Sequence, residues 1–347
     1  MRIAFFVNSI EGETVNYSTT HLALAALSRG HDICYLTPGD FVLRPDDTLV
    51  VRALMLPASN YKKAETLLHD LQNGATIETI DVANIDILML RNDPSEDAAE
   101  RPWAAHVGAV FGRLAAARGV IVLNDPDGLT RAENKLYFQD FPASVRPETL
   151  ISKNIDEIRA FIQRQKKGVI LKPLQGSGGK NVFKIASPKD ANLKQIFEAV
   201  SEEGYLIAQG FMPEAADGDV RFFLMNGRPL QRDGKYAAFR RAPAKGEIRS
   251  NMHVGGSAEA VEVNETMLTI AETVRPKLVQ DGMFLVGLDI VGNKLLEINV
   301  FTPGGLNNLS QMYETNFPKT VIEALEKKLV IRDGNGGKLS NRELAML

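Results

Sequence analysis

The chain has 347 residues, of which 44% are hydrophobic, and 40 basic residues nearly balance 43 acidic ones to give a formal net charge of −3. This length and composition allow a large core and predict two or three domains or subdomains. The balanced charge argues against a nucleic-acid-binding protein, and the single cysteine excludes an intramolecular disulfide. No apolar run reaches transmembrane length, so we expect a cytoplasmic protein with no membrane segment.

The first 127 residues alternate between strand and helix patterns. Apolar strands are predicted at 3–7, 31–36, 85–90 and 120–123, with helical patterns at 21–29 and 103–118. This order predicts a parallel sheet covered by helices. The loop at 8–17 has one glycine, so the dinucleotide-binding fingerprint of three spaced glycines is absent. Arg91 and Asp93 follow a strand at the carboxyl edge of the sheet, where open α/β sheets bind ligands.

A helix is predicted at 129–138, and a glycine-rich loop follows further along the chain. A strand at 169–173 leads into Gln175-Gly176-Ser177-Gly178-Gly179-Lys180, and a second strand follows at 182–185. The loop does not match the Walker pattern, because Leu174 and Asn181 stand where glycine and Ser or Thr are required. We interpret it as a flap whose backbone N–H groups cover phosphates, with Lys172 adding a positive charge. A plain hairpin loop is the alternative.

The next part of the chain combines a hairpin with a cationic segment. The hairpin turns on Asn226-Gly227 and places Asp219 and Arg221 on one face of its first strand. The segment 239–251 contains four basic residues and one acid, which is suited to holding anions, although a solvated surface loop is the alternative. The last helix is predicted at 319–328, and we expect the polar tail after it to be partly disordered.

A second hairpin, at 286–300, places Asp289, Glu297 and Asn299 in an apolar pair of strands. Oxygen ligands without histidine or cysteine favour Mg²⁺ or Mn²⁺ over zinc. A two-residue turn would put Asp289 opposite Leu296, whereas a three-residue or bulged turn at Gly292-Asn293 would put it opposite Glu297. We predict the bulged arrangement, because a shared metal requires both carboxylates on one face. The alternative is an edge hairpin whose polar side chains face solvent.

Taken together, these motifs resemble those of ATP-grasp ligases, and in particular the prokaryotic glutathione synthetase family. The resemblance extends from the first strand to about residue 325, and its motifs are Arg91-Asn92-Asp93-Pro94, Asn134-Lys135, Leu171-Lys172-Pro173 with its flap, Gly218-Asp219-Val220-Arg221, 246–251 and 286–299. It implies an α/β ATP-grasp fold with α+β subdomains. The expected parts are an N-terminal Rossmann-like parallel-sheet domain at 1–127 (the pre-ATP-grasp domain), a small lid subdomain with the flap at 128–208, a C-terminal antiparallel-sheet subdomain at 209–330 and a polar tail at 331–347.

The resemblance also implies roles for individual residues. Those expected to bind the nucleotide are Lys135, Lys172, the flap residues Gly176, Ser177, Gly178 and Gly179, the hinge residues Gln209, Gly210, Phe211 and Met212, and Asp219. Those expected to face the triphosphate and the reacting carboxylate are Arg221 and Arg241. Those expected to bind Mg²⁺ or Mn²⁺ are Asp289, Glu297 and Asn299. Those expected to bind the substrates are Arg91, Asp93, Arg249 and Asn251.

The reaction implied by the resemblance is phosphorylation of a carboxylate by ATP, followed by attack of an amine on the acyl phosphate. Glutathione synthesis from γ-glutamylcysteine and glycine is the expected instance. The partners are then small molecules, and a dimer or tetramer of identical chains is expected. The alternatives are a ligase of another peptide, of the glutamate-adding or D-alanine-joining kind, and a non-catalytic nucleotide-binding protein with the same fold.

Two departures from the family's pattern bear on the substrates. Thr302-Pro303 is kept, but the segment 304–308 is uncharged where an arginine in an acidic context is expected. Asn8 stands where an aspartate is expected after the first strand, and the loop at 10–20 is longer than expected. These positions border the region expected to receive the acid and the amine, so they leave the substrate pair open.

Overall fold

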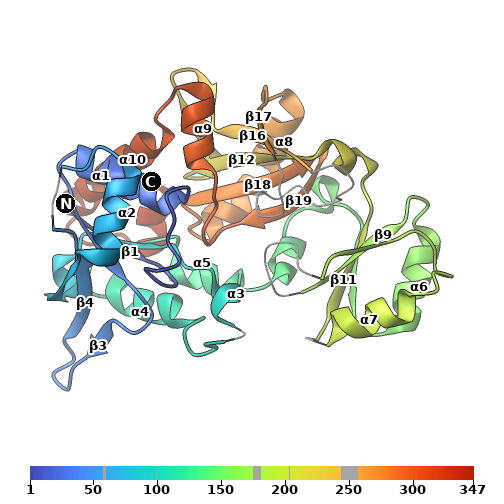
Figure 1. Cartoon of the computed structure of the whole chain (residues 1–347), viewed down its shortest axis with the longest axis horizontal. Coiled ribbons are helices and arrows are strands. Elements are labelled where there is room, and N and C mark those ends of the chain that lie inside the picture. The colour runs from blue at the N-terminus through green and yellow to red at the C-terminus, as the bar shows by residue number, and fades with distance from the viewer. Residues whose placement is uncertain (58–59, 99, 175–180, 203, 244–256) are drawn as a thin grey trace.

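A computed structural model describes residues 1–347 except 58–59, 99, 175–180, 203 and 244–256 (Figure 1). Within the described residues, three main sheets organise the molecule. In Figure 1 the N-terminal sheet and its helices lie at one end, a small sheet with two helices lies at the other, and the third sheet lies between them.

The N-terminal sheet has the strand order β3-β4-β2-β1-β6-β7, and β5 pairs with β4. Its strands are β1 (Arg2–Phe6), β2 (Asp32–Leu36), β3 (Phe41–Leu43), β4 (Leu49–Met55), β5 (Thr76–Asp81), β6 (Ile87–Leu90) and β7 (Ile121–Leu123). The central strands β2, β1, β6 and β7 are parallel, whereas β3, β4 and β5 pair antiparallel. The predicted parallel sheet is therefore confirmed, with an antiparallel extension on one side.

Helices cover both faces of this sheet because successive side chains of β1 point to opposite sides. Ile3 and Phe5 belong to a cluster with residues of several helices, whereas Ala4 and Phe6 belong to the other large cluster. The helices of this part are α1 (Ser18–Ser28), α2 (Ala64–Asn73), α3 (Pro94–Asp97), α4 (Val107–Ala116), α5 (Pro126–Arg131) and α10 (Phe317–Gly334). Strands buried on both faces must be apolar throughout, which is the pattern that the sequence has.

The lid subdomain is an antiparallel sheet of order β10-β9-β11-β8 with its own core. Its elements are β8 (Thr149–Ser152), α6 (Ile155–Arg164), β9 (Val169–Pro173), β10 (Phe183–Ile185), α7 (Leu193–Ser201) and β11 (Leu206–Gly210). Ile158, Phe161 and Leu193 of the two helices pack on Val169 and Leu171 of β9. The alternate residues of β9, including Lys172, therefore lie on the opposite face of the sheet.

The C-terminal sheet has the order β17-β16-β12-β18-β19, and β13 pairs with β12. Its strands are β12 (Asp219–Met225), β13 (Arg228–Pro229), β16 (Ala238–Ala242), β17 (Ser257–Ala260), β18 (Leu285–Val291) and β19 (Lys294–Asn299). A small hairpin, β14 (Gln231–Arg232) and β15 (Lys235–Tyr236), adjoins it, and α8 (Glu265–Gln280) and α9 (Leu306–Tyr313) complete this part.

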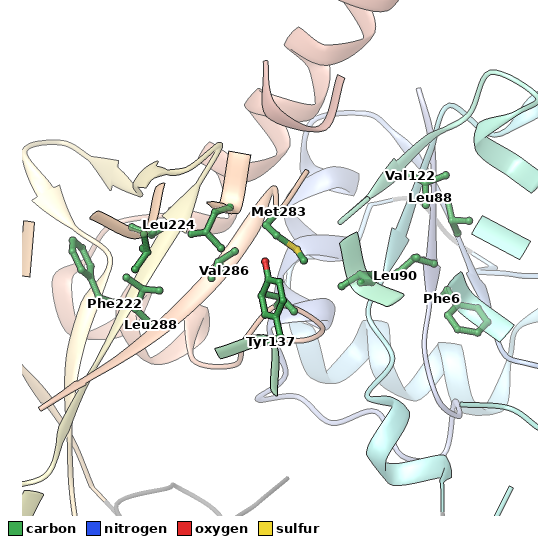
Figure 2. Close-up of a cluster of buried hydrophobic side chains, with 14 of the residues drawn as sticks. Phe6, Leu88, Leu90, Val122, Tyr137, Phe222, Leu224, Met283, Val286 and Leu288 are labelled. Carbon is green, nitrogen blue, oxygen red and sulfur yellow. The ribbon is translucent and has the colours of Figure 1, made fainter. Parts of the chain in front are cut away.

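One hydrophobic cluster joins the N-terminal and C-terminal sheets (Figure 2). Phe6, Leu88, Leu90 and Val122 lie on one side of the view, and Phe222, Leu224, Val286 and Leu288 lie on the other. Tyr137 lies between them, and its hydroxyl donates to Asp281 Oδ2 at 2.9 Å. A shared core of this kind favours a fixed arrangement of the two sheets.

Two expectations from the sequence are wrong. The helix expected at 129–138 is two elements, α5 and a 3₁₀ helix at Lys135–Asp140, because the Asn134 side chain accepts from Leu136 N–H and begins a new turn. The tail expected to be partly disordered instead continues α10 to Gly334 and forms α11 (Asn341–Met346).

The C-terminal helix is held by specific contacts. Ser340 and Glu343 form a capping box at its start, and Asn341 exchanges two hydrogen bonds with the backbone of Val122 at the edge of β7. At its end, Lys328 Nζ donates to the backbone carbonyls of Leu344 and Ala345 at 3.0 and 2.9 Å. The segment is therefore an ordered part of the N-terminal layer.

Candidate active site

A cavity of about 1550 Å³ opens between the carboxyl edge of the N-terminal sheet, the lid subdomain and the C-terminal sheet. Its walls combine cationic, anionic and amide side chains, among them Asn8, Glu13, Arg91, Lys135, Lys172, Gln209, Asp219, Arg221, Arg241, Asp289, Glu297, Asn299 and Asn307. Such a mixed, concave surface is typical of a site for polar small molecules.

The β18–β19 hairpin brings the two predicted metal-binding carboxylates opposite each other. Asp289 pairs with Glu297 and Gly287 with Asn299, whereas Val291 pairs with Lys294 next to the turn. The turn itself is a tight two-residue turn in which Gly292 has φ +55°. The register shifts between Asp289 and Ile290, so the bulge is formed by Leu296 in β19. The predicted register is confirmed, but the predicted location of the irregularity in the turn is wrong.

Two arginines surround Asp289, whose side chain is only 5% exposed. Arg221 donates to both carboxylate oxygens, from Nε at 2.5 Å and from a terminal nitrogen at 3.0 Å, and Arg241 lies 2.8 Å from Oδ2. Burial alone would raise the pKa of Asp289, but the charges and hydrogen bonds of the two arginines outweigh it and hold this pKa below its ordinary value. Asp289 is therefore ionised and shared between Arg221 and Arg241.

Glu297 differs from Asp289, because no hydrogen bond or ion pair engages its carboxylate in the described part of the chain. The Asn299 amide donates to Asp289 Oδ2 at 3.0 Å and would present its oxygen to the cavity if turned over. No group of three or more His, Cys, Asp or Glu forms among the described residues, so a cation here needs the amide oxygen as a ligand. Glu297 fits a divalent cation as it stands, whereas Asn299 fits once its amide is turned over and Asp289 fits once Arg241 releases one oxygen.

Two lysines lie on the wall of the cavity that the predicted lid subdomain forms. Lys172 on β9 donates to Gln209 Oε1 on β11 at 3.2 Å. Burial lowers the pKa of Lys172, and the charge of Glu297 opposes this effect while that of Lys135 adds to it. Lys135 itself is fixed at its backbone, where its N–H donates to Leu174 O at 3.0 Å. Both predicted lysines therefore face the same compartment.

The predicted hinge, residues 209–212, comprises the last two residues of β11 and the two that follow it. Gly210 N–H donates to Glu148 O at 2.9 Å and Phe211 N–H donates to Gly168 O at 3.0 Å, so these two donors are used within the lid. Met212 N–H has no backbone partner among the described residues. Of these three N–H groups, that of Met212 is thus the one without a backbone acceptor among the described residues.

Asp219 and Arg241 are direct partners across β12 and β16. Arg241 Nε lies 3.1 Å from Asp219 Oδ2, and a terminal nitrogen of Arg241 makes a further hydrogen bond to the same oxygen. Although burial would lower the pKa of Arg241, the charges of Asp289 and Asp219 raise it. Arg221, Arg241, Asp219 and Asp289 form one buried network of two positive and two negative charges.

At the edge of the N-terminal sheet, Asn8 joins two loops. Its Nδ2 donates to Asp93 O and to Asp97 Oδ2, both at 2.8 Å, and its Oδ1 accepts from Asp93 N–H at 2.7 Å. An aspartate could not donate to Asp97, so the amide at position 8 matches its partner here. Asp93 Oδ1 accepts hydrogen bonds from the N–H and the hydroxyl of Ser95. This residue, predicted to bind substrate, therefore caps the N-terminus of α3 in the structure.

Several predicted residues lie outside the described part of the chain: Gly176, Ser177, Gly178, Gly179, Arg249 and Asn251. One wall residue, Glu13, was not predicted. A single acid in a loop has no distinguishing sequence signal, and its position beyond a strand's carboxyl end is the one clue that was available.

No helix in the described ranges is both long and apolar enough to cross a membrane.

Two family models match the chain. That of the prokaryotic glutathione synthetase N-terminal domain matches residues 1–130, and that of the prokaryotic glutathione synthetase ATP-grasp domain matches residues 134–314. The chain is 32% identical to a glutathione synthetase of Vibrio vulnificus (strain CMCP6) over 319 residues, which cover 90% of this chain and 93% of that one. It is 34% identical to a glutathione synthetase of Parasynechococcus marenigrum (strain WH8102) over 310 residues, which cover 89% and 93%.

Solved structures share the fold at low sequence identity. The D-cycloserine synthetase DcsG superposes with a TM-score of 0.63 at 13% identity, covering 94% of this chain and 99% of that one. The ATP-grasp ligase PsnB, in complex with a minimal precursor, superposes with a TM-score of 0.59 at 16% identity, covering 93% and 98%. The α/β ATP-grasp fold predicted from the sequence is confirmed.

Proposed function

Because this chain belongs to the prokaryotic glutathione synthetase family, we propose that it joins the carboxylate of γ-glutamylcysteine to the amine of glycine, using ATP and releasing ADP and phosphate. The chain is an ATP-dependent carboxylate–amine ligase. The observation that carries the proposal is the group formed by Asp289, Glu297, Arg221 and Arg241 on one wall of the cavity, with Lys172 across from it on the lid.

The nucleotide is held between the lid and the C-terminal sheet in this proposal. Lys172 and Lys135 meet the phosphates and the base from the lid side, and Met212 N–H meets the edge of the base. Glu297, Asn299 and Asp289 hold a divalent cation, Mg²⁺ or Mn²⁺. When bound, such a cation neutralises charge that develops on the phosphate oxygens during phosphoryl transfer.

Arg221 and Arg241 orient the reacting groups. Each guanidinium is fixed by Asp289, and Arg241 also by Asp219, so both are preorganised before substrate arrives. A carboxylate oxygen of the acid attacks the γ-phosphorus, and ADP leaves. The neutral amine nitrogen then attacks the acyl carbon, phosphate leaves, and the nitrogen loses one proton to give the neutral amide. Protein groups supply charge and position rather than a nucleophile.

The test is a product assay. The protein is incubated with ATP, Mg²⁺, γ-glutamylcysteine and glycine, and ADP and glutathione are quantified by mass spectrometry. The proposal expects one glutathione per ADP. Formation of ADP without glutathione, or turnover only with other acid and amine pairs, would overturn the substrate assignment. Glu262→Gln, at an exposed position away from the cavity, serves as the matched control for substitutions of Glu297.

A further inference from the structure

Glu13 is a buried acid whose carboxylate makes no ion pair with any described residue. It lies in the loop between β1 and α1, is 7% exposed and lines the cavity. Its Oε2 is shielded from solvent and accepts no hydrogen bond in the described part of the chain. A buried carboxylate without donors is destabilising unless a cation compensates it. A cationic group of a ligand at this position would compensate the buried charge.

Arg91 is a buried cation in the same compartment. It is 5% exposed and makes long hydrogen bonds to three neutral oxygens, Thr19 Oγ1 at 3.3 Å, Phe301 O at 3.4 Å and Pro303 O at 3.3 Å. No carboxylate of the described residues lies within ion-pair distance of its guanidinium. Burial lowers its pKa to about 10, and the charge of Glu13 opposes this. The guanidinium retains free N–H donors for an anion.

The two groups are close enough to influence each other but do not pair. Burial raises the pKa of Glu13 to about 7, and the charge of Arg91 acts in the opposite sense. Two opposite buried charges that line one cavity and form no ion pair with the described residues are suited to a ligand that carries both an ammonium and a carboxylate group. Asn307 and Asn308 of α9 line the same wall and add neutral amides.

We propose that Glu13 and Arg91 hold the zwitterionic amino-acid end of the acid substrate, with Glu13 binding its ammonium group and Arg91 its carboxylate. The inference rests on the proposed function, in which the γ-glutamyl residue carries a free α-ammonium and α-carboxylate at the end remote from the reacting carboxyl. Glu13 is then a specificity residue, since it distinguishes acids with this ammonium group from acids without it.

The test compares γ-glutamylcysteine with glutarylcysteine, which lacks only the α-amino group. In the wild-type protein, kcat/KM is expected to favour γ-glutamylcysteine by about 10- to 150-fold, the range for one hydrogen bond between charged groups. In Glu13→Gln this preference is expected to fall to near unity, while KM for ATP is unchanged. A purely structural role of Glu13 would not change the ratio between the two acids.

Glu11→Gln is the matched control, because Glu11 is exposed in the same loop and does not line the cavity. It should keep the wild-type preference. A Glu13→Gln variant that also keeps it, or a wild-type protein that uses both acids equally, overturns the assignment of Glu13 while leaving glutathione synthesis standing. A wild-type protein that forms no glutathione overturns the proposed function and this inference with it.

Discussion

The two carboxylates that face each other across β18 and β19 should respond differently to the same substitution. Asp289 is buried and bonded to two arginines, whereas Glu297 is only partly buried and has no such partner in the described part of the chain. Asp289→Asn removes the charge that compensates Arg221 and leaves Arg241 with Asp219 alone. Removing one partner of a buried ion pair destabilises a protein by about 3–5 kcal/mol.

We therefore expect Asp289→Asn to lower the free energy of unfolding of the protein by about 3–5 kcal/mol, which corresponds to a decrease in melting temperature on the order of 10 °C. Glu297→Gln should change stability by less than about 0.5 kcal/mol, since the Glu297 carboxylate makes no hydrogen bond or ion pair with the described residues. Both substitutions should lower kcat by at least about 100-fold, because each weakens the charge stabilisation of phosphoryl transfer.

The assay combines scanning calorimetry with the glutathione assay for both variants, and Glu262→Gln is the control. Equal melting temperatures for Asp289→Asn and the wild-type protein would refute the stabilising ion pairs of Asp289 with Arg221 and Arg241. Wild-type turnover by Glu297→Gln would refute its place in a cation site.

The remaining predictions concern buried polar groups. The pKa of Glu13 is raised to about 7, so the native state binds the proton of this group more tightly than the unfolded state does. The free energy of unfolding of the wild-type protein should therefore fall by about 3 kcal/mol relative to that of Glu13→Gln as the pH rises from about 4.5 to 7. A difference in melting temperature between the two proteins that does not change with pH would contradict this. Burial lowers the pKa of Lys328 to about 7, so the unfolded state binds the proton of this group more tightly than the native state does. The free energy of unfolding of the wild-type protein should therefore rise by about 2 kcal/mol relative to that of Lys328→Met between about pH 7 and 9, which thermal melting of both proteins measures. Asn8→Asp places a second carboxylate next to the buried Asp97 and should lower the free energy of unfolding by about 2 kcal/mol. An unchanged melting temperature would refute the hydrogen bond from Asn8 to Asp97.

The sequence predicted the elements of the fold well where its periodicity is strong. The alternation of strands and helices in the first 127 residues predicted the parallel strands β2, β1, β6 and β7. The hairpin at 286–300 was predicted from Gly292-Asn293 between two apolar runs, and Gly292 does adopt positive φ there. These features are local, so a sequence pattern determines them directly.

Features set by tertiary contacts were missed. The bulge at Leu296 depends on which residues the neighbouring strand offers, and the turn residues alone do not reveal it. The C-terminal helix α11 is short and polar, although Ser340 and Glu343 have the spacing of a capping box and were a usable signal. The pairing of Asp289 with two arginines could not be predicted, because it depends on residues far apart in the chain, and the same holds for Glu13, whose Oε2 has no hydrogen-bond partner among the described residues.

The most direct test of the central claim follows an oxygen atom. γ-Glutamylcysteine with ¹⁸O in its cysteinyl carboxylate is incubated with ATP, Mg²⁺ and glycine, and the phosphate released is analysed by mass spectrometry. Attack of the carboxylate on the γ-phosphorus predicts one ¹⁸O transferred to phosphate for each glutathione formed from the doubly labelled acid. Glutathione accompanied by unlabelled phosphate, or the absence of glutathione, would contradict the account.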